Sequence, residues 1–197
     1  MAQNGWMSST ANPSAAAARS SAAAATSAAG QVERLLTSVP DFPTAGILFR
    51  DLSPVFADAT AFRVITEELV APYLGRIDVV GGVEARGFVL AASAALAGGA
   101  GLVVIRKSGK LPAPVLRESY SLEYGTAELE MHAAPFPGQR MLILDDVLAT
   151  GGTLAAAVRL AERAGYQVVG IGVVLELAQL DGAAALPGRE LRSIVSV

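Results

Sequence analysis

The sequence predicts an α/β fold in which helices flank a central, mainly parallel and twisted sheet. Short apolar runs alternate along the chain with segments whose apolar residues recur at helical spacing. Glycine-rich turns follow several of the apolar runs, as they do where strands lead into helices. The chain has 197 residues, enough for one domain with a substantial core.

The N-terminal end of the chain differs in composition from the rest. Residues 8–29 are nearly all Ser, Ala and Thr, so they offer few bulky apolar side chains for a core. We therefore expect residues 1–30 to be a disordered low-complexity tail and residues 31–197 to be the folded domain. A transit peptide would be rich in arginine, and the tail has only Arg19.

Within the folded domain, helices and strands are predicted from the spacing of apolar residues. The segments with a helical pattern are 31–37, 58–73, 87–96 and 152–164. Asp58 is a suitable N-cap for the second helix, and Gly165 can end the last one. The segments with a strand pattern are 77–80, 102–105, 127–131, 141–144, 168–177 and 191–195. Residues 127–131 alternate apolar and acidic side chains, which predicts an antiparallel strand with one face in water.

The segments between these elements are predicted to be irregular. Residues 38–54 contain several Pro and Gly residues, and residues 106–118 form a basic, Pro-containing stretch, so both are predicted to be loops. Gly81 and Gly82 are predicted to form a turn after the strand at 77–80.

The composition argues against several classes of protein. The absence of cysteine excludes disulfides and thiol catalysis and is compatible with a reducing cytosol, where we expect the protein to be. The single histidine, His132, cannot form a His-rich metal site. No apolar run long enough to span a membrane is seen, so no membrane association is expected. With 15 basic and 18 acidic residues, nucleic acid is not expected as a partner, and an anionic ligand must be met by local cations.

The most informative stretch is residues 141–153, MLILDDVLATGGT. A buried strand ends in two adjacent carboxylates, and a small glycine-rich turn then leads into a helix. Backbone N–H groups at such a turn and the helix dipole favour an anion, by about 0.3–1 kcal/mol for the dipole. Carboxylates repel phosphate but accept hydrogen bonds from hydroxyl groups, so the aspartates are expected to face a sugar. The stretch therefore predicts a cradle for ribose 5-phosphate.

Other interpretations of this stretch have weaker support. A P-loop NTPase needs a G-x-x-x-x-G-K-[ST] loop, and neither of the two lysines, Lys107 and Lys110, lies in one. A dinucleotide-binding fold needs G-x-G-x-x-G after a first strand, which is missing here. A tight strand-to-helix connection that binds no ligand remains the alternative.

Residues 141–153 closely resemble the phosphoribosyl diphosphate (PRPP) signature of the type I phosphoribosyltransferases. The resemblance implies the type I phosphoribosyltransferase fold, with a flexible hood loop over the active site. It implies that Asp145 and Asp146 bind the ribose hydroxyls. It also implies that the 5-phosphate is bound by the loop that follows, which consists of Ala149, Thr150, Gly151, Gly152 and Thr153.

A second anion site is predicted at residues 81–87, where another glycine-rich segment leads into a helix with Arg86 at its start. A planar guanidinium beside free N–H groups suits a diphosphate. The spacing resembles the diphosphate loop of the same family, which implies diphosphate binding by Ala85 and Arg86. In that family the region of Lys107 and Lys110 is the hood, so we expect Lys107 to hold the leaving group and Lys110 to act in the hood.

Three further stretches narrow the resemblance to the adenine phosphoribosyltransferases: 41–51, 109–112 and 119–125. The resemblance implies that main-chain groups near Leu48 and Arg50 bind the polar edge of the base. It also implies that Phe49 and Leu177 lie near the faces of the base. Enzymes of the family that use 6-oxopurines have a lysine after the PRPP helix, and no lysine follows Lys110 here. A 6-amino group is a hydrogen-bond donor that backbone acceptors can serve, so adenine is the expected base.

Glu123, in the stretch YSLEYG, is the expected catalytic acid/base for the proton on the purine. The resemblance implies transfer of the phosphoribosyl group from PRPP to adenine, giving AMP and diphosphate in purine salvage. Mg²⁺ is expected on PRPP oxygens and waters without direct protein ligands, and a homodimer is expected because family members are usually dimeric. Two alternatives stay open: a phosphoribosyltransferase for another base, such as xanthine or orotate, and a PRPP-sensing regulator with the same fold.

Overall fold

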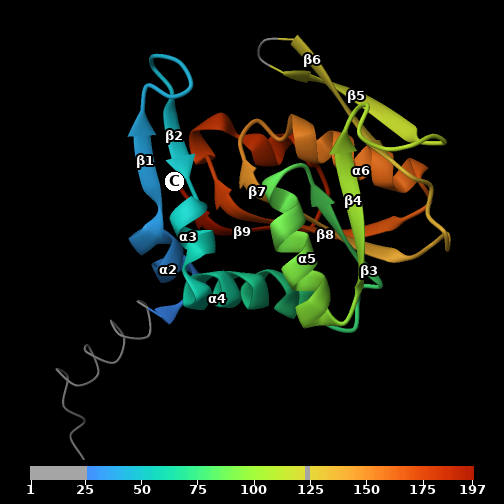
Figure 1. Cartoon of the computed structure of the whole chain (residues 1–197), viewed down its shortest axis with the longest axis horizontal. Helices are drawn as coiled ribbons and strands as arrows, with labels where there is room; N and C mark the ends of the chain where they lie inside the picture. Colours follow the sequence, from blue (N-terminus) through green and yellow to red (C-terminus); the bar gives the residue numbers. More distant parts are fainter. Residues whose placement is uncertain (1–25, 123–124) are drawn as a thin grey trace, which may run out of the picture.

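A computed structural model describes residues 26–122 and 125–197 of the chain (Figure 1). Its main sheet has seven strands in the order β5-β6-β4-β3-β7-β8-β9. Neighbouring strands from β4 to β9 are parallel, whereas the pairs β4–β6 and β5–β6 are antiparallel. The prediction of a mainly parallel sheet flanked by helices is therefore confirmed. The strands are β3 (Val79–Val83), β4 (Gly101–Lys107), β5 (Leu116–Leu122), β6 (Gly125–Met131), β7 (Arg140–Leu148), β8 (Gln167–Glu176) and β9 (Leu191–Ser196).

The α-helices are α2 (Ala28–Leu35), α3 (Ser53–Ala57), α4 (Ala59–Val70), α5 (Arg86–Gly98) and α6 (Gly152–Arg163). The described residues also contain three short 3-10 helices: η1 (Ala71–Tyr73), η2 (Ala178–Leu180) and η3 (Gly182–Ala185). Asp58 accepts hydrogen bonds from the N–H groups of Thr60 and Ala61, so its predicted role as an N-cap is confirmed. Helix α2 begins before the predicted residue 31, because Ser27 caps it and accepts from the N–H of Gly30.

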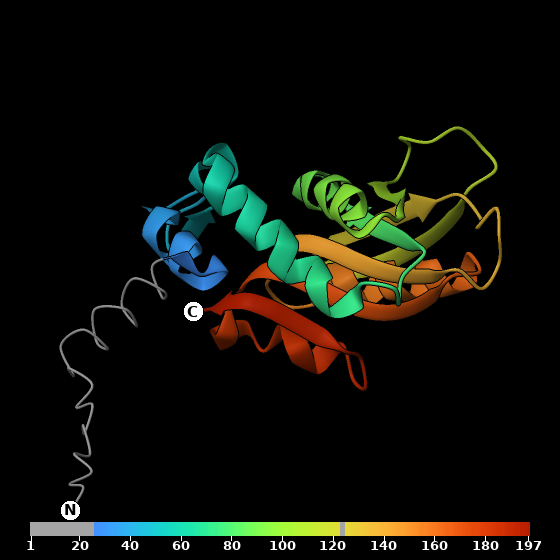
Figure 2. The same cartoon turned by 90° about the horizontal axis from the view of Figure 1, so that it is seen from below.

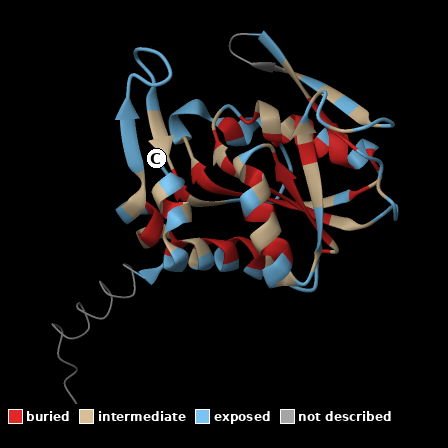
Figure 3. Cartoon of the chain, viewed as in Figure 1, coloured by how far each residue is buried: buried red, intermediate tan, exposed pale blue. Residues whose placement is uncertain are grey.

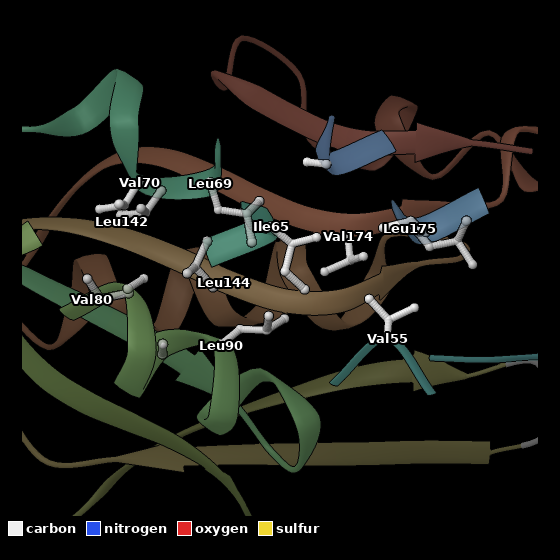
Figure 4. Close-up of a cluster of buried hydrophobic side chains, with 14 of the residues drawn as sticks. Val55, Ile65, Leu69, Val70, Val80, Leu90, Leu142, Leu144, Val174 and Leu175 are labelled. Atoms are coloured by element: carbon white, nitrogen blue, oxygen red, sulfur yellow. The ribbon is translucent and has the colours of Figure 1, made fainter. Parts of the chain in front are cut away.

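Helices cover both faces of the sheet (Figure 2). On β7, Leu142 and Leu144 pack with α2, α4 and α5 in one core cluster, part of which Figure 4 shows. Met141 and Ile143 point to the opposite face and pack with α6 in a second cluster. This alternation explains why the strand is apolar at every position from Met141 to Leu144: each face is buried against helices.

Gly81 and Gly82 lie inside β3, so the predicted turn at these residues is wrong. A Cβ on Gly82 would stand 2.7 Å from both the Cβ of Ala91 and the carbonyl oxygen of Gly87. A Cβ on Gly81 would stand 2.9 Å from the sulfur of Met141. These glycines therefore allow close packing on both faces of a buried strand.

The two predicted loops are also partly wrong. Residues 38–54 contain most of the hairpin of β1 (Thr37–Pro40) and β2 (Leu48–Asp51), followed by the start of α3. Residues 106–118 include the end of β4 and the start of β5, which leaves only 108–115 outside strands. Backbone pairing with a partner strand forms these elements, and that pairing has no signature in local composition.

Strand β6 has the predicted antiparallel pairing, but the prediction that its acidic face lies in water is wrong at Glu130. The side chain of Glu130 is 0% exposed, whereas that of Glu128 is 34% exposed. The segment after β4 crosses over this face of β6 and covers Glu130, as hydrogen bonds from Lys110 and Leu111 to its carboxylate show. In Figure 3, exposed and partly exposed residues predominate on the β5–β6 hairpin and on β1, and buried residues in the central strands.

Candidate functional site

The carboxyl ends of β3 and β7, which are neighbours in the sheet, form the centre of the site. After β3 the chain passes through a cis peptide bond between Glu84 and Ala85 and enters α5 at Arg86. Strand β7 continues through Asp145 and Asp146, beyond the predicted strand end at residue 144. Ligands of open α/β sheets bind at this edge.

Gly87 allows the first turn of α5 to lie directly against the acidic pair. A Cβ on Gly87 would stand 2.7 Å from the carbonyl oxygen of Leu144 and 3.1 Å from Oδ1 of Asp145. Any other residue at this position would push the helix away from β7. The glycine therefore allows the start of α5 to lie against the end of β7.

Arg86 connects three parts of the site. Its guanidinium lies 2.7 Å from Oδ2 of Asp146, whose side chain is 10% exposed. The contact is an ion pair without hydrogen-bond geometry, and Oδ2 is buried with no hydrogen-bond partner in the structure. The same guanidinium lies 5.7 Å from the centre of the Phe49 ring, in a cation–π contact. Arg86 also contributes to lowering the pKa of Asp51, after the hydrogen bonds that Asp51 accepts from Ser53.

Asp145 and Asp146 differ in their electrostatic environment. Removal from water and the neighbouring charge of Asp146 raise the pKa of Asp145 well above its usual value. Oδ1 of Asp145 accepts a hydrogen bond of 2.9 Å from the N–H of Asp146, which opposes the shift without cancelling it. Asp145 is partly exposed and lines the site, so a carboxyl group of raised pKa faces any ligand there.

A pocket of about 510 Å³ lies between the acidic pair and the β5–β6 hairpin. The residues that line it are Glu84, Ala85, Arg86, Lys107, Tyr120, Ala127, Leu129, Asp145, Asp146 and Thr153. Arg86 and Lys107 bring two cations to this pocket, as the sequence led us to expect. The sequence analysis did not predict that Glu84 and Tyr120 line this pocket. Both residues belong to stretches, 81–87 and 119–125, in which it named other residues as functional.

Glu84 also fixes the end of β4. Its Oε2 accepts a hydrogen bond of 2.8 Å from the N–H of Lys107 and one of 3.3 Å from Nε of Arg106. The pKa of Glu84 is lowered chiefly by the hydrogen bond from the Lys107 N–H, so the carboxylate stays charged. This contact places Lys107 beside the start of α5.

A smaller pocket of about 70 Å³ lies at the start of α6 and is lined by residues 147–154 together with Asp145. Gly151 caps α6 with φ +79°, and no side chain satisfies the free N–H groups of the first turn. No acidic residue stands in that turn. The site therefore offers backbone donors and the positive end of a helix dipole to an anion. Asp145 and Thr153 line both pockets, so the two are neighbours.

The phosphate loop predicted at residues 149–153 is supported from behind by η3. A Cβ on Gly151 would overlap the carbonyl oxygen of Gly182 and stand 2.8 Å from the Cβ of Ala185. A Cβ on Gly182 would overlap the carbonyl oxygen of Ala149. Asp181-Gly182 is a turn signal in the sequence, but a turn signal does not tell which segment the turn packs against.

The remaining predicted residues are not gathered in these pockets. Leu48 is 49% exposed on the β1–β2 hairpin, and Arg50 donates a hydrogen bond across that hairpin to Ser38. Leu177 packs beside the core, with its N–H bonded to the carbonyl oxygen of Leu148. Lys110 lies outside both linings and donates its backbone N–H to Glu130. Glu123, the expected acid/base, lies outside the described residues.

The Phosphoribosyl transferase domain family matches residues 58–186. The chain belongs to this family. Among its relatives, the adenine phosphoribosyltransferase of Renibacterium salmoninarum is 59% identical over 166 residues, which are 84% of this chain and 91% of that protein. The adenine phosphoribosyltransferase of Clavibacter michiganensis subsp. michiganensis is 60% identical over 167 residues, 84% of this chain and 95% of that protein. The resemblance to this branch of the phosphoribosyltransferases is thus confirmed.

Solved structures of phosphoribosyltransferases have the same fold. The adenine phosphoribosyltransferase of Rhodothermus marinus is 44% identical, with a TM-score of 0.81 over 86% of this chain and 98% of that one. The Saccharomyces cerevisiae enzyme, solved with adenine and an imino-altritol bisphosphate, is 33% identical, with a TM-score of 0.80 over 85% of this chain and 98% of that one. The type I phosphoribosyltransferase fold is therefore confirmed.

Neither a metal cage nor a membrane span is found in the described part of the chain. Residues 26–122 and 125–197 contain no group of three His, Cys, Asp or Glu side chains placed to bind one metal ion. In the same residues, no helix has the length and hydrophobicity needed to cross a bilayer.

Proposed function

We propose that this phosphoribosyltransferase transfers the 5-phosphoribosyl group from PRPP to adenine, giving AMP and diphosphate, and so serves purine salvage. The observation that carries the proposal is the pair of neighbouring pockets that share Asp145 and Thr153. One end offers free backbone N–H groups at the start of α6, and the other offers Arg86 and Lys107. The curated relatives at 59–60% identity are named adenine phosphoribosyltransferases, which supports adenine as the base.

In this proposal, PRPP lies across the acidic pair. The 5-phosphate accepts hydrogen bonds from the loop of Ala149, Thr150, Gly151, Gly152 and Thr153, where the helix dipole favours its charge. The ribose hydroxyls donate to Asp145 and Asp146, and the position of both side chains in the lining of the larger pocket supports this role. Ala85, Arg86, Lys107 and Lys110 bind the diphosphate, with Arg86 exchanging part of its contact with Asp146 for phosphate oxygens.

The chemical step forms a bond between the sugar C1 and a ring nitrogen of adenine, while the C1–O bond to diphosphate breaks. Glu123 accepts the proton that this nitrogen loses. The negative charges of Asp145 and Asp146 favour the positive charge that develops on the sugar, and the cations stabilise the departing diphosphate. Adenine is held by main-chain groups of Leu48 and Arg50 and by contacts with Phe49 and Leu177. The T-shaped contact between Phe49 and Phe42, with ring centres 5.1 Å apart, supports a fixed position for that ring.

Mg²⁺ and a homodimer are parts of the same proposal. When bound, Mg²⁺ would be held by PRPP oxygens and waters and would neutralise charge on the diphosphate. Asp145 and Asp146 line the larger pocket with carboxylate oxygens, which would accept hydrogen bonds from waters bound to such an ion. We further propose that the protein acts as a homodimer in the cytoplasm.

A substrate panel tests the proposal. The full chain is incubated with PRPP, Mg²⁺ and one base at a time, and diphosphate release is measured for adenine, hypoxanthine, guanine, xanthine and orotate. Adenine is expected to have by far the highest kcat/KM. Comparable efficiency with hypoxanthine would mean that another base is the substrate, and PRPP binding without release for any base would indicate a PRPP-sensing regulator.

A further inference from the structure

The side chain of Glu130 is fully buried, although it bears a carboxylate. On β6 it lies in register between Arg106 of β4 and Arg117 of β5. A buried carboxylate is unfavourable unless hydrogen bonds and an opposite charge satisfy it. The groups that satisfy Glu130 therefore show what this residue holds in place.

Most of these groups belong to the turn 108–111. Oε1 of Glu130 accepts hydrogen bonds from the N–H groups of Lys110 at 2.6 Å and Leu111 at 2.7 Å. Oε2 forms an ion pair with Nε of Arg117 at 3.3 Å. Burial alone would raise the pKa of Glu130, but the N–H groups of residues 109–111 and Arg117 outweigh it and lower the pKa to about 2. We call Glu130 together with the N–H groups of residues 109–111 the clamp. Its carboxylate is charged at any physiological pH, and hydrogen bonds to a charged group are stronger than those between neutral groups.

The clamp is on the opposite side of β6 from the pocket. Successive side chains of a strand alternate between its faces. Leu129 is the register partner of Lys107, and both line the 510 Å³ pocket. Glu130 points to the other face, where the chain bends back after Lys107 and the N–H of Ser108 bonds to the carbonyl oxygen of Glu128.

The two lysines of the whole chain lie directly before this turn and within it. Lys107 precedes the turn and lines the pocket, and Lys110 lies in the turn itself. We infer that Glu130 is a positioning residue for diphosphate binding: it holds the turn 108–111 and thereby sets where both lysines stand relative to Arg86. This inference rests on the proposed function, since it names the substrate group on which the clamp acts.

The variant Glu130→Gln tests the inference, because it keeps the size of the side chain and removes the charge. The KM for PRPP is expected to rise about tenfold, the effect of weakening charge-assisted hydrogen bonds, while the KM for adenine changes by less than roughly twofold. Glu190→Gln is the control: it makes the same change at an exposed carboxylate that pairs with Arg76 and Arg192. Glu190 directly precedes β9, the edge strand at the opposite end of the sheet from β5 and β6. Its effect on either KM is expected to stay below roughly twofold.

A double-mutant cycle separates positioning from general stability. If Glu130 acts through the lysines, Glu130→Gln has little further effect on the KM for PRPP in a chain that already carries Lys107→Ala and Lys110→Ala. An undiminished effect there, or a parallel rise of both KM values with a fall in Tm, would overturn the inference. Calorimetric titration with magnesium diphosphate gives a second readout that needs no turnover, and the same pattern is expected in its Kd.

Two further outcomes are distinguishable. If Glu130→Gln does not fold, Leu111→Pro removes one backbone donor to Glu130 and leaves the carboxylate intact, and it is expected to raise the KM for PRPP selectively; a normal KM would refute the clamp. If the unaltered chain releases no diphosphate from PRPP with any base, the proposed function fails. If the unaltered chain is active and Glu130→Gln behaves like it, only the inference about Glu130 fails.

Discussion

Gly151 of the phosphate loop and Gly182 of η3 pack backbone against backbone, with no room for a Cβ on either. Gly182 also lies against the carbonyl oxygen of Ala149, the first residue of the loop 149–153. A segment about thirty residues further along the chain therefore sets the shape of the loop proposed to bind the 5-phosphate.

This packing predicts that Gly182→Ala displaces the phosphate loop. Overpacking costs about 1–3 kcal/mol, and part of that cost is expected as weaker PRPP binding, because the N–H groups lose their alignment. The KM for PRPP in the diphosphate-release assay measures the effect. Ala184→Ser, an exposed change in the same short helix, is the control and is expected to behave like the unaltered chain. An unchanged KM for Gly182→Ala would show that η3 does not support the loop.

Arg86 is predicted to be needed for diphosphate binding. Arg86→Gln removes the charge beside Asp146 and the cation–π contact with Phe49. Loss of a hydrogen bond to a charged group costs about 1.5–3 kcal/mol, so kcat/KM for PRPP is expected to fall roughly 10- to 100-fold. Arg86→Lys keeps the charge without the planar fork and should recover only part of the loss. Full activity of Arg86→Gln would remove Arg86 from the site.

Asp145 is predicted to stabilise the substrate complex at the expense of the free protein. Its raised pKa means that the folded protein binds a proton more tightly than the unfolded chain. Stability is therefore lost as pH rises above the unfolded value of 3.8 toward the folded pKa. Asp145→Asn removes this penalty, so its Tm at pH 7 should exceed that of the unaltered chain, by a margin that narrows toward pH 4.

The same substitution should impair the reaction, since an amide cannot offset developing positive charge on the sugar. Steady-state kinetics with PRPP and adenine test this half of the prediction. A variant with lower Tm and normal kinetics would contradict both halves.

Glu123→Gln is predicted to separate catalysis from binding. If Glu123 accepts the adenine proton, kcat should fall about 100-fold or more, because general base catalysis contributes typically 10²–10⁴-fold. The adenine Kd, measured by calorimetric titration, should change little. A large loss of adenine affinity with normal kcat would assign Glu123 to binding.

Asp78 and Arg140 are predicted to contribute pH-dependent stability at the N-terminal ends of β3 and β7. Asp78 accepts hydrogen bonds from Nε and the backbone N–H of Arg140. These hydrogen bonds, the side-chain one first, lower the pKa of Asp78 to about 2. A lowered pKa gives stability that is present above the unfolded value of 3.8 and lost as pH falls toward 2. Asp78→Asn should therefore lower the Tm at pH 7 and have less effect at pH 3. An equal loss at both pH values would contradict this.

Much of the central sheet could be predicted because its strands carry their own signal. Residues 141–144 are an apolar run, followed by two aspartates and a glycine-rich turn. This pattern predicts a strand, a pair of acidic side chains at its end and the start of a helix, without reference to distant residues. The same local logic identified Arg86 at the start of α5 and Asp58 as a cap.

What the sequence could not predict depends on distant contacts. Gly81 and Gly82 have the composition of a turn but lie in a strand, because Met141 and Ala91 occupy the space that side chains would need. The alternating pattern of residues 127–131 predicts that Glu130 lies on a solvent-exposed face of the strand. Glu130 is buried instead, because the turn 108–111 folds over it.

The sequence by itself therefore determined which stretches have the chemistry to bind anions, which residues carry charge, and the order of the central strands and the helices between them. Local spacing and composition are sufficient for that, since strand, turn and cap preferences act over a few residues. Only the tertiary structure decided how Gly182 packs behind the phosphate loop and which carboxylate binds the turn 108–111 beside the two lysines. Those relationships depend on close packing between segments far apart in the chain, and packing is not encoded in any single segment.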